Sequence, residues 1–129
     1  MEDKIDDELT GKIIGLCFEV HKKLGPGFPE KVYHNALAIL LERNNIKHES
    51  ERNFGVFFEN QKVGSFRCDL LIENELILEL KAVEGFMPKL LINQMVAYLK
   101  ASNNKRGLLV NFGTLSCTIK RVSNTTPFE

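Results

Sequence analysis

The sequence predicts an α/β domain in which two helices precede a three-stranded meander, a third helix and one or two further strands. Apolar residues recur at helical spacing up to about Asn44. From Glu51 they follow the spacing of strands, and a third helical stretch begins near Pro88. These changes of period, in this order, are typical of a sheet covered by helices.

The first two helices have recognisable ends. Thr10 is a suitable N-cap for a helix that runs to about Leu24, and Gly25 provides the stop that follows it. Pro29 then occupies the first turn of a second helix, where proline is tolerated. We expect this second helix to end near Asn44, because two asparagines follow its apolar positions.

The remaining elements are bounded by turn-forming residues. Polar turns at residues 59–61 and 73–75 separate the first three strands. A helix is expected from Pro88 to about residue 101, and two strands follow it. The expected strands are residues 52–58, 62–72, 75–83, 106–112 and 117–122.

Length and composition limit the class of protein. With 129 residues, 43% of them hydrophobic and 26% charged, we expect one domain over residues 1–129, with a core at about 12–122 and flexible ends at 1–9 and 123–129. No apolar run is long enough to span a membrane, and the acidic start lacks the features of a secretory signal, so we expect a cytoplasmic protein. Basic and acidic residues number 17 each, so any nucleic-acid binding must depend on a local patch.

The stretch RCDLLIENELILELKAVE places charged residues inside an otherwise apolar hairpin. If its turn centres on Asn74, Asp69 lies directly opposite Glu79, and Lys81 follows on the same face. The charged face is expected to contain Arg67, Asp69, Leu71, Ile77, Glu79, Lys81 and Val83. The apolar face is expected to contain Phe66, Cys68, Leu70, Ile72, Leu76, Leu78, Leu80 and Ala82.

Two opposed carboxylates need a physical explanation. Their Cβ atoms would be about 5 Å apart, and two like charges at that distance repel by about 3 kcal/mol at an effective dielectric near 20. A divalent cation such as Mg²⁺ or Mn²⁺ would remove this repulsion, with Lys81 beside it to hold a water or a phosphate. The alternative is an exposed ion-pair cluster in which Lys81 and Arg67 neutralise Asp69 and Glu79, and spacing alone does not separate the two explanations.

These residues resemble a known group of enzymes. Asp69 followed by Glu79-Leu80-Lys81 on adjoining strands is similar to the D…(D/E)xK signature of the PD-(D/E)XK nuclease superfamily. The segment from Gly27 to Tyr33 matches the GxxExxY pattern that names a small bacterial and archaeal branch of it. The similarity covers about residues 12–122 and departs from the superfamily name at Cys68, where some members have proline. The resemblance implies a restriction-endonuclease-like core, with a mixed central sheet of about four or five strands flanked by helices.

The resemblance also implies roles for the residues of the hairpin. Asp69 and Glu79 would be ligands of Mg²⁺ or Mn²⁺, and the backbone carbonyl of Leu80 would be a third ligand. Lys81 would position the attacking water or stabilise the charge that develops on the phosphate. All of these would then be catalytic or metal-binding groups of one site.

Further candidates lie on the helices. Gln94 and Tyr98, four residues apart, are similar to the QxxxY element of RecB-like nucleases, which supports the active site. Gln94 is the stronger of the two, since a tyrosine at this spacing is also a natural core aromatic. Glu30 belongs to the motif that names the branch and is a candidate catalytic and metal-binding residue ahead of Glu19. A charge that complements the helix dipole is the alternative explanation for Glu30.

The predicted function is that of a metal-dependent nuclease that hydrolyses phosphodiester bonds in DNA. We expect nucleic acid as its partner and no membrane association, and a homodimer is one possible assembly. Two alternatives stay open. The first is a catalytically inactive nucleic-acid-binding or regulatory module of the same fold, which the neutral net charge favours. The second is a small protein-interaction domain that uses Phe54, Phe57 and Phe58, although we expect these phenylalanines in the core of the sheet.

Overall fold

The computed structural model describes residues 2–128, with side chains described from residue 8 onward. This part of the chain forms three helices and seven strands. The helices are α1 (Glu2–Leu24), α2 (Glu30–Arg43) and α3 (Lys89–Ser102). The strands are β1 (His48–Ser50), β2 (Asn53–Phe58), β3 (Gln61–Arg67), β4 (Leu70–Ile72), β5 (Leu76–Lys81), β6 (Arg106–Asn111) and β7 (Thr118–Ser123).

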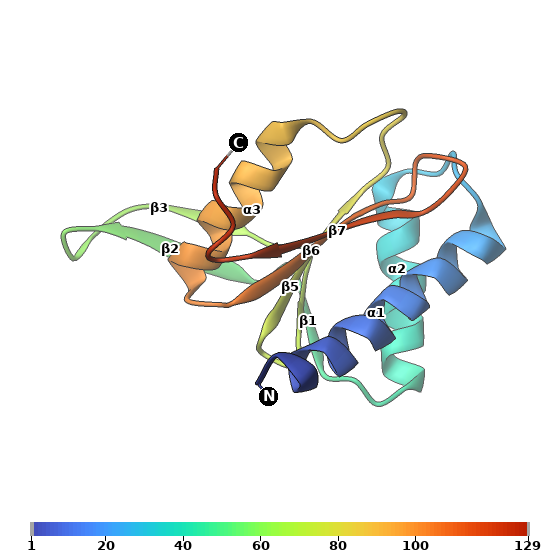
Figure 1. Cartoon of the computed structure of the whole chain (residues 1–129), viewed down its shortest axis with the longest axis horizontal. Helices are drawn as coiled ribbons and strands as arrows, with labels where there is room; N and C mark the ends of the chain where they lie inside the picture. The colour runs from blue at the N-terminus through green and yellow to red at the C-terminus, as the bar shows by residue number, and fades with distance from the viewer. Residues whose placement is uncertain (1, 129) are drawn as a thin grey trace.

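A five-stranded mixed sheet of order β1-β4-β5-β6-β7 forms the centre of the molecule (Figure 1). Strands β5 and β6 are parallel and are connected through α3, whereas the other neighbours in this sheet are antiparallel. Parallel strands need such a crossover, which buries them on both faces. The predicted α/β class with a mixed central sheet flanked by helices is therefore confirmed.

The two faces of this sheet are covered by different helices. Helices α1 and α2 lie together on one face, and α3 lies on the other (Figure 1). The larger core lies under α1 and α2, where Leu78 and Leu80 of β5 pack with Tyr33 and Phe112. The smaller core lies under α3 and consists of Cys68, Leu71, Ile77, Met95, Val96, Leu99 and Val122.

The helix boundaries agree with the sequence except at the N-terminal end. Pro29 and Pro88 are the N-caps of α2 and α3, and Gly25, at φ +71°, follows α1. Helix α1 begins at Glu2 and not at Thr10. Thr10 lies inside the helix and is buried, so it is not the N-cap. Acidic residues before Thr10 suit the first turns of a helix, which explains the earlier start. Within the described residues, no helix is long and apolar enough to cross a lipid bilayer.

The expectation that the two ends of the chain are flexible stays a prediction. Residue 1, the side chains of residues 2–7 and residue 129 lie outside the described part. At the C-terminal end, the backbone N–H of Asn124 donates to the carbonyl of Lys105. The ammonium of Lys100 also lies 4.7 Å from the ring centroid of Phe128.

The expected three-stranded meander is divided by a kink. The predicted strand 62–72 breaks into β3 and β4 at Cys68 and Asp69, and the opposite chain turns at Glu51, which has φ +56°. Two backbone hydrogen bonds cross the kink, from Glu51 N–H to the Asp69 carbonyl (2.9 Å) and from Cys68 N–H to the Arg52 carbonyl (3.1 Å). The pairing register is therefore kept while the ribbon bends, and the short strand β1, absent from the sequence prediction, pairs with β4.

The kink changes which side chains face α3. Strand alternation predicts Phe66 and Cys68 on the same face as Leu70, but Cys68 packs in the core under α3. The ring of Phe66 stacks on Tyr98 of α3, with 3.9 Å between ring centroids. The predicted faces were wrong at these two positions because alternation holds only within an unbroken strand.

Strands β2 and β3 form a separate two-stranded sheet that projects from the body of the molecule (Figure 1). Phe57 is 64% exposed and Phe58 is 65% exposed, whereas Phe54 is half-buried and stacks on Phe66. The expectation that all three phenylalanines belong to the sheet core is correct only for Phe54. A projecting ribbon has no second layer to cover its outer residues, which explains the exposure of the other two.

Candidate active site

Asp69 lies at the kink, where β4 begins. Residues Leu70 to Ile72 pair with Leu78 to Leu76, so the predicted register around Asn74 is confirmed. Beyond Leu70 the ladder ends, and the backbone N–H of Leu80 donates to Asp69 Oδ2 at 2.6 Å. The carboxylate thus replaces the missing ladder partner and is held beside β5.

Glu79 is directed to the same face as Asp69, towards α3. Leu78 and Leu80 on either side of it belong to the core under α1 and α2, so alternation turns Glu79 to the opposite face. Its side chain is only 6% exposed. Burial, the charge of Asp69 and a hydrogen bond with the Asp69 side chain raise the pKa of Glu79 to about 9, although Lys81 opposes the increase. At neutral pH and without a cation, Glu79 therefore keeps its proton beside the Asp69 carboxylate.

Lys81 is the last residue of β5, on the same face as Glu79, and its side chain is half-buried. The three predicted residues of the hairpin are thus brought together. The backbone after Lys81 is fixed by Asn111, which is fully buried. Asn111 Oδ1 accepts from the N–H groups of Val83 and Gly113, and its Nδ2 donates to the Val83 carbonyl, all at 3.0 Å.

Asn111 is a residue that the sequence analysis missed. The signal was present, because an asparagine between apolar residues near the end of a buried strand requires partners for its amide. In the structure it joins the end of β5 to the turn after β6. A β-carbon on Gly113 would lie 2.4 Å from the Val83 carbonyl oxygen, so the two backbones meet without room for a side chain.

Tyr98 of α3 stacks on Phe66, which precedes the kink at Cys68 and Asp69. Burial is the main cause that raises the pKa of Tyr98, and the charges of Glu79 and Asp69 contribute to the same increase. An aromatic column formed by Phe54, Phe66 and Tyr98 holds its ring, so Tyr98 is both a packing residue and a neighbour of the site. Gln94 lies one helical turn earlier and is exposed. Its role stays a prediction.

Glu30 is the first residue of α2, and it is exposed. Within residues 8–128, no three His, Cys, Asp or Glu side chains form a cluster that could hold a metal, so Glu30 does not join Asp69 and Glu79 in a preformed set. Its role as a ligand stays a prediction. Glu19 on α1 forms an ion pair with Lys23 (3.3 Å).

The structure explains the tyrosine of the GxxExxY pattern. Tyr33 is fully buried and stacks on Phe112, with 4.6 Å between ring centroids. Its hydroxyl donates to the Gly25 carbonyl at 2.6 Å and accepts from the Phe28 N–H at 3.1 Å. Tyr33 therefore fixes the loop that leads into α2 and positions the start of that helix, where Glu30 lies.

The ion-pair alternative is wrong for the described residues. Three salt bridges are found among them, Lys23–Glu19, Lys31–Glu51 and Arg52–Glu49, and neither Asp69 nor Glu79 takes part. Arg67 is exposed. Buried Glu79 and half-buried Asp69 therefore have no basic side chain at salt-bridge distance among the described residues.

The donor set fits a hard divalent cation. Mg²⁺ is typically bound through one or two carboxylates, and waters and substrate phosphate complete its shell. Asp69 and Glu79 supply two carboxylates on one face, and a cation between them would displace the proton of Glu79. Lys81 lies beside the pair, where it would face the phosphate and not compete for the cation.

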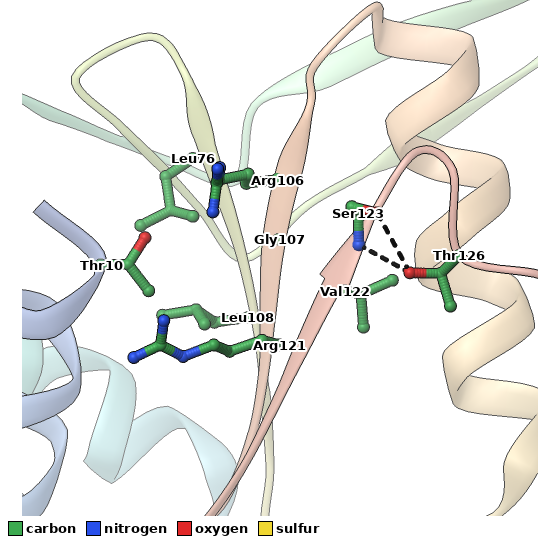
Figure 2. Close-up of a pocket in the computed structure, with 9 residues that line it drawn as sticks. All are labelled: Thr10, Leu76, Arg106, Gly107, Leu108, Arg121, Val122, Ser123 and Thr126. Atoms are coloured by element: carbon green, nitrogen blue, oxygen red, sulfur yellow. Dashed lines mark hydrogen bonds between the residues drawn. The ribbon is translucent and has the colours of Figure 1, made fainter. Parts of the chain in front are cut away.

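A separate cavity of about 140 Å³ lies at the other end of the strands (Figure 2). It is lined by Thr10 of α1, by Arg106 and Leu108 of β6 and by Arg121 of β7, with Ser123 and Thr126 bonded to each other at its edge. Arg106 begins β6, whereas Glu79 and Lys81 lie opposite the last half of this strand. Ligands of α/β sheets bind at the carboxyl ends of parallel strands, so the carboxylate pair and not this cavity is the candidate active site.

Comparisons with known proteins agree with this geometry. The family model described as the PD-(D/E)XK nuclease superfamily matches residues 7–122, which is most of the chain. No curated protein matches the sequence. Among solved structures, the crystal structure of SSO0001 is similar, with a TM-score of 0.58 and 17% sequence identity over 72% of this chain. The chain spans about half of that protein (48%), and at this identity the likeness concerns the fold alone.

The extent of the family match and the arrangement of the residues lead to one conclusion. The match includes both strands of the hairpin and all of α3. Within it, the aspartate and the ExK residues that give the superfamily its name lie side by side on one face of the mixed sheet. The chain therefore belongs to the PD-(D/E)XK nuclease superfamily.

Proposed function

We propose that the protein is a divalent-metal-dependent nuclease that hydrolyses phosphodiester bonds in DNA. One observation carries the proposal: the carboxylates of Asp69 and Glu79 lie together on the α3 face of the sheet, with Lys81 beside them. Membership of the superfamily supports the reaction class. We also assign the chain to the GxxExxY branch, on the pattern from Gly27 to Tyr33 and on the structural role of that tyrosine.

In this proposal each residue has a defined task. A bound Mg²⁺ or Mn²⁺ would lower the pKa of a coordinated water and neutralise the scissile phosphate. Asp69 is held in place by the Leu80 N–H and presents its carboxylate to the cation together with Glu79. Lys81 stabilises the charge on the phosphate from its half-buried position beside buried Glu79. The Leu80 carbonyl and Glu30 are proposed as further ligands, and Gln94 as a support for Lys81.

A cleavage assay with matched variants tests this function. Wild-type protein is incubated with single-stranded, duplex and branched DNA in Mg²⁺, in Mn²⁺ and in EDTA. We expect metal-dependent cleavage that Asp69→Asn abolishes and that Glu42→Gln, an exposed carboxylate on α2, leaves unchanged. Cleavage by Asp69→Asn at the wild-type rate would contradict the assignment.

One observation favours a second function, that of an inactive nucleic-acid-binding or regulatory module. Because Glu79 keeps its proton at neutral pH, the carboxylate pair is stable without a cation. Thermal unfolding with and without Mn²⁺ distinguishes the two functions, since a ligand that binds only the folded state raises the melting temperature. A wild-type protein whose melting temperature ignores Mn²⁺, and which cleaves no DNA, would support the module.

The exposed end of the β2–β3 ribbon is the observation behind a protein-interaction role. Phe57, Phe58 and Val63 are each 64% or 65% exposed there. A homodimer through this ribbon is one form of such an interaction. Sedimentation of wild type and of a Phe57→Ser variant would detect it as a difference in mass.

A further inference from the structure

A second cavity borders the candidate active site on the α3 face. Its volume is about 230 Å³, and it lies where the loop between β5 and α3 meets the first turn of α3 and the start of β7. In Figure 1 this loop arches away from the sheet before it enters α3. The cavity is lined by Gly85, Phe86, Met87, Ile92, Leu109, Thr118, Ile119 and Lys120.

The floor of the cavity is continuous with the carboxylate pair. Leu109 is the register partner of Glu79 in the parallel pair β5–β6. Its neighbours Leu108 and Val110 belong to the core under α1 and α2, so Leu109 shares the α3 face with Glu79. Adjacent strands lie about 4.8 Å apart, so the cavity begins one strand away from the proposed site of cleavage.

The wall of the cavity contains an aromatic side chain that is fully exposed. Phe86 is 100% exposed, and Leu90, one turn further on, is 73% exposed. Gly85, at φ +77°, turns the backbone directly before Phe86. Exposed apolar side chains that gather at a cavity mark interaction sites, and this one has a π-face available for stacking.

The charges around the cavity favour an anionic chain. Lys120 lines it, and Lys89 begins α3 directly after the loop; both are exposed. None of the eight described lining residues is acidic, and Glu84 is the one acidic residue in the loop beside it. Lysines bind phosphate as point charges, so the surroundings suit the phosphates on either side of a bound base.

The volume of the cavity fits a ligand with a small ring system. Pockets for drug-sized ligands have volumes of about 300–1,000 Å³, and this cavity is smaller. Its walls are mostly apolar and offer an aromatic face, an aliphatic floor and one ammonium. These features suit one planar base better than a folded peptide or a second helix, and a base inside a duplex would not be able to enter.

We propose that this cavity binds one unpaired nucleobase of the substrate strand, stacked on Phe86, next to the phosphate that is cleaved. The inference rests on the proposed nuclease function and adds the class of substrate: a nucleic acid that is single-stranded or unpaired at the site. Lys89 and Lys120 bind the flanking phosphates. Phe86 therefore determines specificity for unpaired over paired strands.

Binding of labelled oligonucleotides tests the proposal. The probes are a fluorescein-labelled oligothymidine, the same strand annealed to its complement, an RNA strand of the same sequence, and a strand in which abasic sites replace the bases. Fluorescence anisotropy is measured with wild type in EDTA, so that no strand is cleaved. We expect Phe86→Ala to weaken binding of the single strand about 5- to 150-fold, the range that stacking of one base provides, with Phe86→Trp restoring it.

The controls distinguish stacking from a general loss of folding or charge. Phe18→Ala removes a partly exposed phenylalanine on α1, across the sheet, and should bind as wild type does. The abasic strand should bind Phe86→Ala and wild type equally, because it has no base to stack. The RNA strand should follow the DNA strand, since both present a base. Equal binding of the oligothymidine by Phe86→Ala and wild type, or equal loss on the abasic strand, would overturn the proposal.

The two proposals fail in different ways. Metal-dependent cleavage that requires Asp69 but not Phe86 would support the nuclease function and contradict the base-binding cavity. Base-dependent binding through Phe86 without cleavage in any metal would retain the pocket and remove the nuclease. Absence of binding to every strand would remove the pocket.

Discussion

The two faces of the central sheet are supplied by the same strands but are built for different purposes. Under α1 and α2, every side chain that β5 contributes is aliphatic and buried. Under α3, the same strand contributes Ile77 to a smaller core and then Glu79 and Lys81. The difference teaches that one face stabilises the fold while the other carries two acidic groups and a lysine, because successive side chains of one strand point to opposite faces of the sheet.

The strongest test of this division is a truncation on the apolar face. Leu78 is fully buried, and Leu78→Ala should lower the free energy of unfolding by about 2–5 kcal/mol, through lost burial and the cavity that remains. Urea denaturation measures the loss. At a temperature where the variant is folded, its rate of DNA cleavage should equal that of wild type; a matching loss of cleavage would show that the faces are coupled.

The complementary test removes a charge from the other face. Lys81→Ala should reduce the cleavage rate about 10²–10³-fold, the effect of removing one group that stabilises transition-state charge. Its free energy of unfolding should change little, since Lys81 is half-buried and ends its strand. Lys12→Ala, an exposed lysine on α1, is the matched control for net charge. A Lys81→Ala enzyme of wild-type rate would refute the role proposed for this residue.

The carboxylate pair predicts a dependence of stability on pH. Folded Glu79 has a pKa of about 9 against an ordinary value of 4.5, so the folded state holds a proton that the unfolded state releases. In EDTA, the contribution of this proton to the free energy of unfolding is complete below about pH 4.5 and is lost as pH rises towards 9. The free energy of unfolding should fall across this range by at most about 1.4 kcal/mol per pH unit. Urea denaturation across this range measures it. Glu79→Gln should flatten the curve, and Glu42→Gln should not.

Bound metal should change the free energy of unfolding with pH in the opposite direction to the proton on Glu79. A cation bound by Asp69 and Glu79 displaces the proton, so the stabilisation by Mg²⁺ should grow as pH rises. A Mg²⁺ effect that is independent of pH would place the cation elsewhere.

The smallest expected effect concerns the loop before α2. Tyr33→Phe removes the hydroxyl that bridges the Gly25 carbonyl and the Phe28 N–H. The cost should be about 0.5–1.5 kcal/mol in the free energy of unfolding, the net contribution of a typical hydrogen bond, because the two backbone groups are only partly buried and water can replace the hydroxyl. If the loop also positions Glu30, the cleavage rate should fall in the folded variant. An unchanged rate would restrict the tyrosine to a packing role.

The sequence was sufficient for the features that depend on local patterns. The turn at Asn74 and the alternation of β5 predicted the register that brings Asp69 to Glu79. The prolines predicted the starts of α2 and α3. The kink at Glu51 was not predictable, because a glutamate with positive φ carries no local signal, and it reversed the faces of Phe66 and Cys68.

Tertiary partners decided what remained. Asn111 is important only because the end of β5 passes beside it, and the exposure of Phe57 and Phe58 follows from a ribbon that leaves the sheet. Neither fact is contained in the periodicity of one segment.

The bond from Leu80 to Asp69 has a consequence for how such domains lose activity over time. Asp69 serves the architecture as well as the proposed chemistry, since its carboxylate accepts the Leu80 N–H where the β4–β5 ladder ends. Selection for folding alone would keep Asp69 after catalysis had become dispensable. Lys81, at the end of β5, would then be under no selection and could be replaced. Among descendants of this chain, retention of the aspartate would therefore be poor evidence of catalytic activity. Replacement of the lysine would be an early sign that catalytic activity had been lost.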